Sequence, residues 1–280
     1  ITNFFLNNKL TGGLIKKIIK FAPEREFPPM SEKNLGKWMK SYISNITPEA
    51  KRGKLYLFKD EFTNYLDAHT GIAAIQFFTR LGYEVIIPDT KESARTWLSK
   101  GLVRTAKKIA NNNISLLKDK ISEETPLVGI EPSAILGFRD EYPDLANDEL
   151  KEDSKNIAEN CLMFEEFIAR EIDAGRITKD DFTKDRLNIK FHGHCQQKAI
   201  AGTSASMKIL SYPENYHAEE IPSGCCGMAG SFGYEKEHYE LSMKVGEMIL
   251  FPAVREASKD TVIVAGGTSC RCQIKDGTDK

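Results

Sequence analysis

From residue 54 onward, short apolar runs alternate with longer segments in which apolar residues recur at helical spacing. Short runs bounded by breakers predict buried strands, and recurrence every third or fourth position predicts amphipathic helices. The predicted strands are residues 55–58, 84–87, 127–130, 188–191, 218–221 and 261–265. The clearest helical patterns are residues 71–81, 93–117, 153–172, 196–210 and 234–257. This alternation predicts an α/β fold with parallel sheets.

Residues 1–50 have a different organisation. Helical patterns at 10–21 and 35–43 are separated by a segment that contains Pro23, Pro28 and Pro29. We interpret this part as a helical connecting arm. Because the chain begins with Ile1 rather than methionine, we expect it to be a piece of a longer polypeptide.

When strand 55–58 is aligned with strand 188–191, the helices and strands that follow occur at similar intervals in the two halves of the predicted fold. The alignment pairs Cys195 with about Glu61, Cys225-Cys226 with about Thr90-Lys91, and Cys270 with about Ser133. We therefore predict an internally duplicated β-α-β-α-β unit, although two unrelated α/β segments can also align by chance. Its parts are a first repeat without these thiols at 51–150, a connecting helix at 151–186 and a cysteine-bearing repeat at 187–280.

Five of the six cysteines belong to the second repeat, just past the ends of predicted strands. They are Cys195, Cys225, Cys226, Cys270 and Cys272. Ligands of open parallel sheets bind at the carboxyl ends of the strands, so these residues are expected to converge. Thiolates suit iron–sulfur clusters, zinc or copper(I). Two adjacent cysteines chelate one ion awkwardly, which favours two irons of one cluster, or one ligand beside a redox-active thiol.

Composition and charge limit the partners. The formal charge is −1, with 39 basic and 40 acidic side chains, so nothing points to nucleic acid. The sequence contains neither an apolar run of transmembrane length nor an opening signal peptide. We expect a cytoplasmic protein, or one bound peripherally at the inner membrane. A structural Cys225–Cys226 disulfide is disfavoured there, because the cytosol is reducing and a bridge between neighbours is strained.

Longer motifs surround the cysteines. They are Cys225-Cys-Gly-Met-Ala-Gly-Ser-Phe-Gly-Tyr234, Leu250-Phe-Pro-Ala-Val-Arg255 and Gly267-Thr-Ser-Cys-Arg271, with Phe62-Thr-Asn-Tyr65, Gly129-Ile-Glu-Pro-Ser133 and Phe138-Arg-Asp-Glu-Tyr142 in the first half. Together they resemble the cysteine-rich CCG domain of heterodisulfide reductase and of the iron–sulfur component of anaerobic glycerol-3-phosphate dehydrogenase. They are most similar to the carboxy-terminal part of FAD-linked dehydrogenases of the D-lactate dehydrogenase and glycolate oxidase type.

This resemblance implies an iron–sulfur cluster, either an ordinary [4Fe–4S] cluster or a non-cubane form held by five cysteines. Cys195, Cys225, Cys226 and Cys270 match the motif. Cys272 matches less well, because the usual ending is Cys-x-x-Cys and Gln273 stands where the second thiol belongs. Cys272 is then either a substitute ligand or an inert thiol. The resemblance also implies FAD in a preceding part, flavin and ferredoxin-like domains as partners, and a quinone or another electron carrier.

Other polar residues near the strand ends have several interpretations. His192 and His194 beside Cys195 either tune a cluster through hydrogen bonds, supply a ligand, or line a loop. Cys161 lies in a helical pattern and is interpreted as core packing. Asp60, Glu61, Glu131 and Ser133 lie at the strand ends of the first repeat. They either bind a hard cation, help Arg95 or Arg139 hold a substrate carboxylate, or serve only the scaffold.

Three functions remain open. The first is an electron-transfer module of an FAD-linked 2-hydroxy acid dehydrogenase, catalytically silent alone because no hydride-transfer machinery is evident in its 280 residues. The second is a structural zinc or protein-interaction module. The third is a thiol–disulfide enzyme that uses Cys225 and Cys226.

Overall fold

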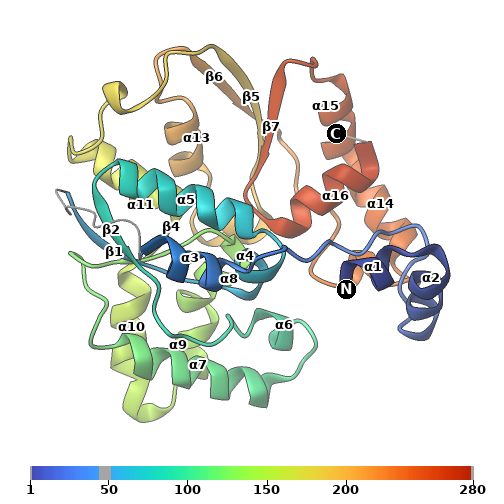
Figure 1. Ribbon diagram of the computed structural model, residues 1–280, viewed down its shortest axis with the longest axis horizontal. Coiled ribbons are helices and arrows are strands. Elements are labelled where there is room, and N and C mark those ends of the chain that lie inside the picture. Colours follow the sequence, from blue (N-terminus) through green and yellow to red (C-terminus); the bar gives the residue numbers. More distant parts are fainter. Residues whose placement is uncertain (1, 44–51, 279–280) are drawn as a thin grey trace.

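The structure is a computed structural model that describes residues 2–43 and 52–278. Within those residues the chain forms a four-stranded and a three-stranded sheet, all of whose paired strands are parallel (Figure 1). The α/β prediction with parallel sheets is therefore confirmed. The part of the predicted arm at 44–50 lies outside the described residues.

The first sheet has the strand order β2-β1-β3-β4. Its strands are β1 Gly53–Leu57, β2 Tyr83–Ile86, β3 Leu127–Gly129 and β4 Cys161–Met163. Helices lie on both faces, so strands such as β3 are buried on both sides and read as continuous apolar runs. Side chains of α7 (Val103–Leu117) and α10 (Lys151–Glu159) pack in one core. Those of α3 (Leu35–Ile43), α5 (Ala68–Arg80) and α11 (Phe164–Asp173) pack in the other.

The second sheet has the order β6-β5-β7, which repeats the β2-β1-β3 order of the first. Its strands are β5 Leu187–His192, β6 Tyr216–Glu220 and β7 Thr261–Ala265. Helix α13 (Ser204–Leu210) lies on the opposite side of the sheet from α14 (Tyr239–Met248), α15 (Leu250–Glu256) and α16 (Thr268–Thr278) (Figure 1). The shared order is what a duplicated unit predicts. The boundaries of the two repeats remain a prediction.

The carboxyl ends of the two sheets meet. Glu131, which follows β3, accepts a hydrogen bond from the Thr268 backbone N–H after β7 at 2.8 Å. Short helices begin at the same strand ends, namely α4 (Glu61–Tyr65) after β1, α8 (Pro132–Ile135) after β3 and α12 (Cys195–Ile200) after β5. The interface between the halves therefore lies at the carboxyl ends of the strands, where the sequence analysis predicted the candidate ligands.

The arm joins both halves through buried contacts. Helices α1 (Thr2–Asn7) and α2 (Lys9–Ile18) lead to Arg25, whose side chain is fully buried in the second half. Arg25 donates hydrogen bonds to the Gly233 carbonyl and the Ser242 hydroxyl, both at 2.9 Å, and pairs with Asp276 at 2.8 Å. Farther along, Leu35 of α3 lies in the core of the first half. The arm is thus an integral part of the fold.

Several predicted helices are shorter than their patterns. Residues 93–117 divide into α6 (Arg95–Leu98) and α7, residues 196–210 into α12 and α13, and residues 234–257 into η4 (Phe232–Tyr234), α14 and α15. The single helix predicted over 153–172 is wrong at its centre, because β4 separates α10 from α11 there. Glu166 ends the strand by accepting the Met163 backbone N–H at 2.9 Å, which begins α11. Residues 151–186 are consequently not one connecting helix.

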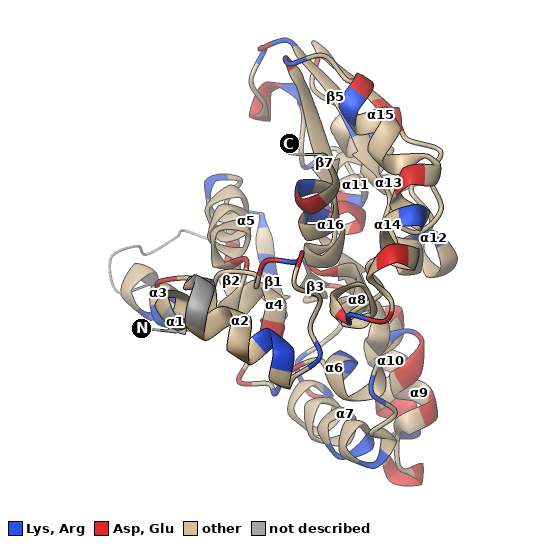
Figure 2. Ribbon diagram, turned by 90° about the vertical axis from the view of Figure 1, so that its right-hand side faces the viewer, with Lys and Arg blue, Asp and Glu red and all other residues tan. Residues whose placement is uncertain are grey.

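Charged side chains of both signs are interspersed over the helices of both halves (Figure 2). No helix among the described residues is both long enough and apolar enough to span a membrane.

Candidate metal centre

Three strand ends of the second sheet carry the candidate centre. His192 is the last residue of β5, and His194 and Cys195 follow it; Cys225 and Cys226 follow β6; Cys270 follows β7 in the first turn of α16. Because β5 is the central strand, β6 and β7 bring their following loops to either side of it. The tertiary fold therefore places residues far apart in sequence next to one another.

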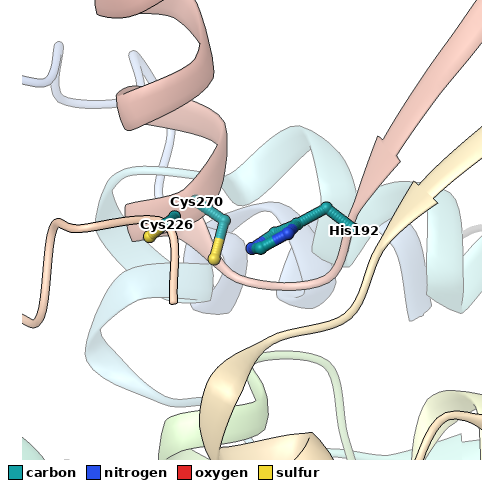
Figure 3. Close-up of side chains that lie close together, drawn as sticks. All are labelled: His192, Cys226 and Cys270. Carbon is teal, nitrogen blue, oxygen red and sulfur yellow. The ribbon is translucent and has the colours of Figure 1, made fainter. Parts of the chain in front are cut away.

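The innermost part consists of His192, Cys226 and Cys270, whose ligand atoms all lie within 4.8 Å of one another. Their exposed fractions are 0%, 4% and 1%. Figure 3 shows the imidazole ring directed toward the two sulfur atoms. The His192 Nδ1 atom lies 2.7 Å from the Ser223 hydroxyl oxygen, whereas Nε2 is buried without a hydrogen-bond partner among the described residues.

Cys225 and Cys195 extend this group toward the surface, since Cys225 is half-buried and Cys195 exposed. Hydrogen bonds from the Cys195 and Cys226 thiols hold the pKa of Cys225 well below its usual range. A hydrogen bond from Cys226 likewise lowers the pKa of Cys270 to about 5. Donation to these neighbours raises the pKa values of Cys195 and Cys226. The four thiols thus form one connected group that favours anionic sulfur, the form that binds metals.

The turn after the cysteine pair depends on Gly227. Its φ of +96° lies in the left-handed region, and a Cβ atom there would stand 2.2 Å from the Ser242 carbonyl oxygen. The Gly227 N–H donates to the Cys225 sulfur at 3.3 Å. Lys198 of α12 also holds the loop, donating to the Gly224 carbonyl oxygen at 2.8 Å. These contacts orient the adjacent cysteines without a helix, since α14 begins only at Tyr239.

Cys272 lies apart from the connected thiols. Its pKa is raised mainly by burial, and the groups that act on it are Tyr234, Asp67, Asp276 and Arg271 rather than another cysteine. Gln273, at the position of the missing second thiol, directs its amide to the Ser242 carbonyl oxygen at 3.0 Å. Ligation by Cys272 therefore remains a prediction without a contact that supports it.

Two other sequence candidates have structural roles. Cys161 lies in β4 instead of a helix and is fully buried, and burial raises its pKa to about 12. Its interpretation as a core residue is confirmed. His194 is the N-cap of α12, where its Nδ1 accepts the Gln196 backbone N–H at 3.2 Å. Of the two histidines, His192 is the one whose ring nitrogen lies within 4.8 Å of both the Cys226 and the Cys270 sulfur atoms.

At the corresponding strand ends of the first half, the carboxylates accept hydrogen bonds from groups of the protein itself. Asp60 caps α4 by accepting the backbone N–H groups of Phe62 and Thr63, both at 2.8 Å. Glu61 at the first position of α4 accepts two hydrogen bonds from Ser93, at 2.8 and 2.9 Å. Glu61 thereby links the start of α4, after β1, to the segment that follows β2.

The two arginines considered for substrate binding are engaged with protein groups. Arg95 pairs with Glu141, and Arg139 binds both Glu166 and the Cys161 carbonyl oxygen. These contacts favour the scaffold interpretation of the first half.

The residues present fit a bound metal or iron–sulfur group. The fold gathers four soft sulfur donors, two of which have lowered pKa values, and it directs a buried imidazole nitrogen without an oxygen or nitrogen partner among the described residues at two of these sulfurs. A buried polar atom without a partner costs about 1–3 kcal/mol, so its position beside two thiols requires an explanation. Cysteine and histidine together suit iron–sulfur clusters and zinc.

The fold and the centre define an α/β protein with a cysteine-histidine donor group at its strand ends. Comparison with known proteins indicates the class of protein to which it is similar. No family model matches the chain. Over 280 residues it is 25% identical to the D-2-hydroxyglutarate dehydrogenase of Escherichia coli (strain K12), and the matched region covers 98% of this chain and 26% of that protein. The C component of the same organism's anaerobic glycerol-3-phosphate dehydrogenase is 22% identical over 280 residues, which cover 99% of this chain and 68% of that protein.

A third relative is the lactate utilization protein A of Macrococcus caseolyticus (strain JCSC5402). It is 24% identical over 229 residues, which cover 79% of this chain and 87% of that protein. The chain is therefore homologous to parts of oxidoreductases. It spans about a quarter of the length of the D-2-hydroxyglutarate dehydrogenases that it matches.

Proposed function

We propose that the chain is the iron–sulfur electron-transfer part of an FAD-linked 2-hydroxy acid dehydrogenase. The observation that carries this proposal is the convergence of Cys195, Cys225, Cys226 and Cys270 at the strand ends of one sheet. The homology to parts of oxidoreductases supports a redox role. A CCG-type [4Fe–4S] cluster, ordinary or non-cubane, would supply one-electron chemistry when bound.

The chain's own residues would hold, shield and expose this group. The four thiols would bind it, and Gly227 permits the turn that presents two of them. Met228, Leu250 and Phe251 are buried in the same core as Cys226 and Cys270, and they exclude water from that side. Cys195 lies at the exposed edge, which is where an electron carrier has the shortest approach. FAD and the oxidation of the hydroxy acid would belong to other parts of the polypeptide, with ferredoxin-like domains and a quinone or another carrier as partners.

The decisive experiment is anaerobic purification followed by iron and acid-labile sulfide analysis and EPR spectroscopy. We expect iron and sulfide in cluster stoichiometry and an EPR signal on reduction or oxidation. The Cys226→Ser variant should lose or convert that signal, whereas the Cys161→Ala variant, altered in the core of the other half, should retain it. Absence of iron from the anaerobic sample would overturn the proposal.

A second candidate is a structural zinc site, because His192 lies with the Cys226 and Cys270 thiols, and the neighbouring Cys225 would complete the Cys₃His set that is common for zinc. Stoichiometric zinc in a colourless, redox-silent sample would establish it in place of the cluster. A thiol–disulfide enzyme that uses Cys225 and Cys226 would instead show reversible dithiol titration in a metal-free sample.

A further inference from the structure

His192 has the geometry of a ligand that is already oriented. It ends β5 and is fully buried, and its Nδ1 lies 2.7 Å from the Ser223 hydroxyl oxygen. In one assignment of the hydrogens, the Ser223 hydroxyl donates to the Ile221 carbonyl oxygen at 3.4 Å and its oxygen accepts the Nδ1 hydrogen of His192. This assignment leaves Nε2 as the unprotonated nitrogen. Metal-binding histidines are commonly oriented by such a bond from their other ring nitrogen.

The free nitrogen is directed at the thiols. Nε2 lies with the Cys226 and Cys270 sulfur atoms in a group whose members are all within 4.8 Å of one another (Figure 3). No oxygen or nitrogen atom of the described residues hydrogen-bonds to it, the group beside it is the Cys270 thiol, whose pKa His192 helps to lower, and its residue is nowhere exposed to water. Ligation of the same metal as the two sulfur atoms would explain why this nitrogen is buried beside them.

The thiol set is also one member short. The Cys-x-x-Cys ending is absent, Gln273 hydrogen-bonds to Ser242, and Cys272 interacts with Tyr234 instead of a thiol. Four sulfurs and one nitrogen therefore meet at the site. We propose that His192 Nε2 is the fifth protein ligand of the cluster, in place of a cysteine. This inference rests on the proposed function.

The consequence concerns charge. A neutral imidazole in place of a thiolate removes one negative charge from the bound group, and it therefore favours the reduced state. Replacement of cysteine by histidine has this effect on other iron–sulfur centres, whose potentials rise. The chain is thus expected to accept electrons at a higher potential than a five-cysteine version of the same site.

The test uses the full chain labelled with ¹⁵N-histidine and reconstituted anaerobically with ferrous iron and sulfide. Pulsed EPR should detect one strongly coupled histidine nitrogen in the unmodified sequence, a measurement that does not depend on whether a variant folds. The coupling should disappear in His192→Ala and persist in His217→Ala, which alters an exposed histidine. In His192→Cys it should also disappear, and the midpoint potential should fall.

Failure of this inference can be distinguished from failure of the proposed function. A normal cluster signal without strong histidine coupling, or with the same coupling in His192→Ala, overturns only the ligand assignment. If the chain takes up no iron and sulfide, the proposed function is overturned. The ligand assignment is then tested with cobalt(II) as the probe. The cobalt form should then show a hyperfine-shifted imidazole N–H resonance that is lost in His192→Ala, which would show that His192 is a metal ligand. Absence of this resonance overturns that role. A chain that takes up neither iron nor cobalt overturns both proposals.

Discussion

The carboxylate of Glu131 accepts the backbone N–H of Thr268 at 2.8 Å, although the two residues follow strands of different sheets. Thr268 is the first residue of α16, and Cys270 lies two positions farther along the same helix. The first half therefore supplies an N-terminal cap to the helix that presents a candidate ligand. This contact gives the half without the candidate thiols a direct structural effect on the centre.

Replacement of Glu131 with alanine should destabilise the protein. The change leaves the buried Thr268 N–H without its acceptor, and loss of a cap or of a buried charged hydrogen bond costs about 1–3 kcal/mol. Denaturant unfolding should show this decrease, and the variant should also lose its metal faster to a chelator. The control is Glu159→Ala, which removes an exposed carboxylate of α10. Equal unfolding midpoints for both variants would contradict the capping role.

The turn after the cysteine pair should tolerate a methyl group at one glycine and not at the other. Gly227→Ala forces a residue with a side chain into φ +96° and against the Ser242 carbonyl oxygen. Gly224→Ala places its methyl group where no atom of the described residues lies within 4 Å. We expect a loss of at least about 2 kcal/mol of stability for Gly227→Ala, which follows from overpacking and backbone strain. Gly224→Ala should remain near the parent.

Thermal unfolding and metal content measure this contrast. Comparable melting temperatures for the two glycine variants would show that the turn can relax. Retention of metal by a folded Gly227→Ala variant would show that the turn does not control the positions of Cys225 and Cys226.

Stability should fall as pH rises through the range in which Asp60 titrates. Burial, together with the negative charge of Glu131, raises the pKa of Asp60 from 3.8 to about 8. Between these values the folded chain keeps a proton that the unfolded chain has released, so rising pH favours unfolding. The slope contributed by one such proton is roughly 1.4 kcal/mol per pH unit. Burial also raises the pKa of Glu165, to about 7, which adds a decrease of the same sign.

The Asp60→Asn variant isolates the first contribution. Asparagine keeps an oxygen for the N–H groups of Phe62 and Thr63 and has no charge to bury. Unfolding free energies measured between pH 5 and pH 8 should decline less steeply in this variant than in the parent. Asp89→Asn, at an exposed position, should leave the slope unchanged. Parallel profiles for the parent and Asp60→Asn would refute the prediction.

Alkylation should separate the cysteines into classes. In the metal-free chain, Cys225 should react fastest with iodoacetamide because its lowered pKa provides a thiolate, whereas Cys195, which is exposed but has a raised pKa, should react more slowly. Cys161 should stay unmodified in the folded protein, because it is buried and its pKa is raised to about 12. Peptide mass spectrometry before and after metal loading should show at least about tenfold protection of Cys195 and Cys225. Undiminished labelling of Cys195 in the loaded form would exclude it as a ligand.

Much of the secondary structure could be predicted because it has local causes. Strands β5 and β7 contain the β-branched or aromatic apolar residues that predicted them, β6 was indicated only by a weak apolar run at 218–221, and the helical spacing at residues 35–43 corresponds to α3. The short strand β4 could not be distinguished, because a three-residue buried strand and a buried helical segment show the same apolar residues. Its pairing with β3 is a long-range contact that leaves no periodicity of its own.

The sequence by itself determined the chemistry available to this protein: soft sulfur donors that follow strands, an adjacent cysteine pair, and a glycine that the turn after the pair requires. It also indicated that the ligands meet at one edge of a parallel sheet, because alternating strands and helices predict parallel strands whose carboxyl ends lie at the same edge. Only the tertiary structure decided that His192 faces the thiols while His194 caps a helix, and that Cys272 interacts with Tyr234 instead of the other cysteines. The physical reason is that the direction of a side chain at a strand end depends on hydrogen bonds to residues distant in sequence, such as the bond between His192 and Ser223.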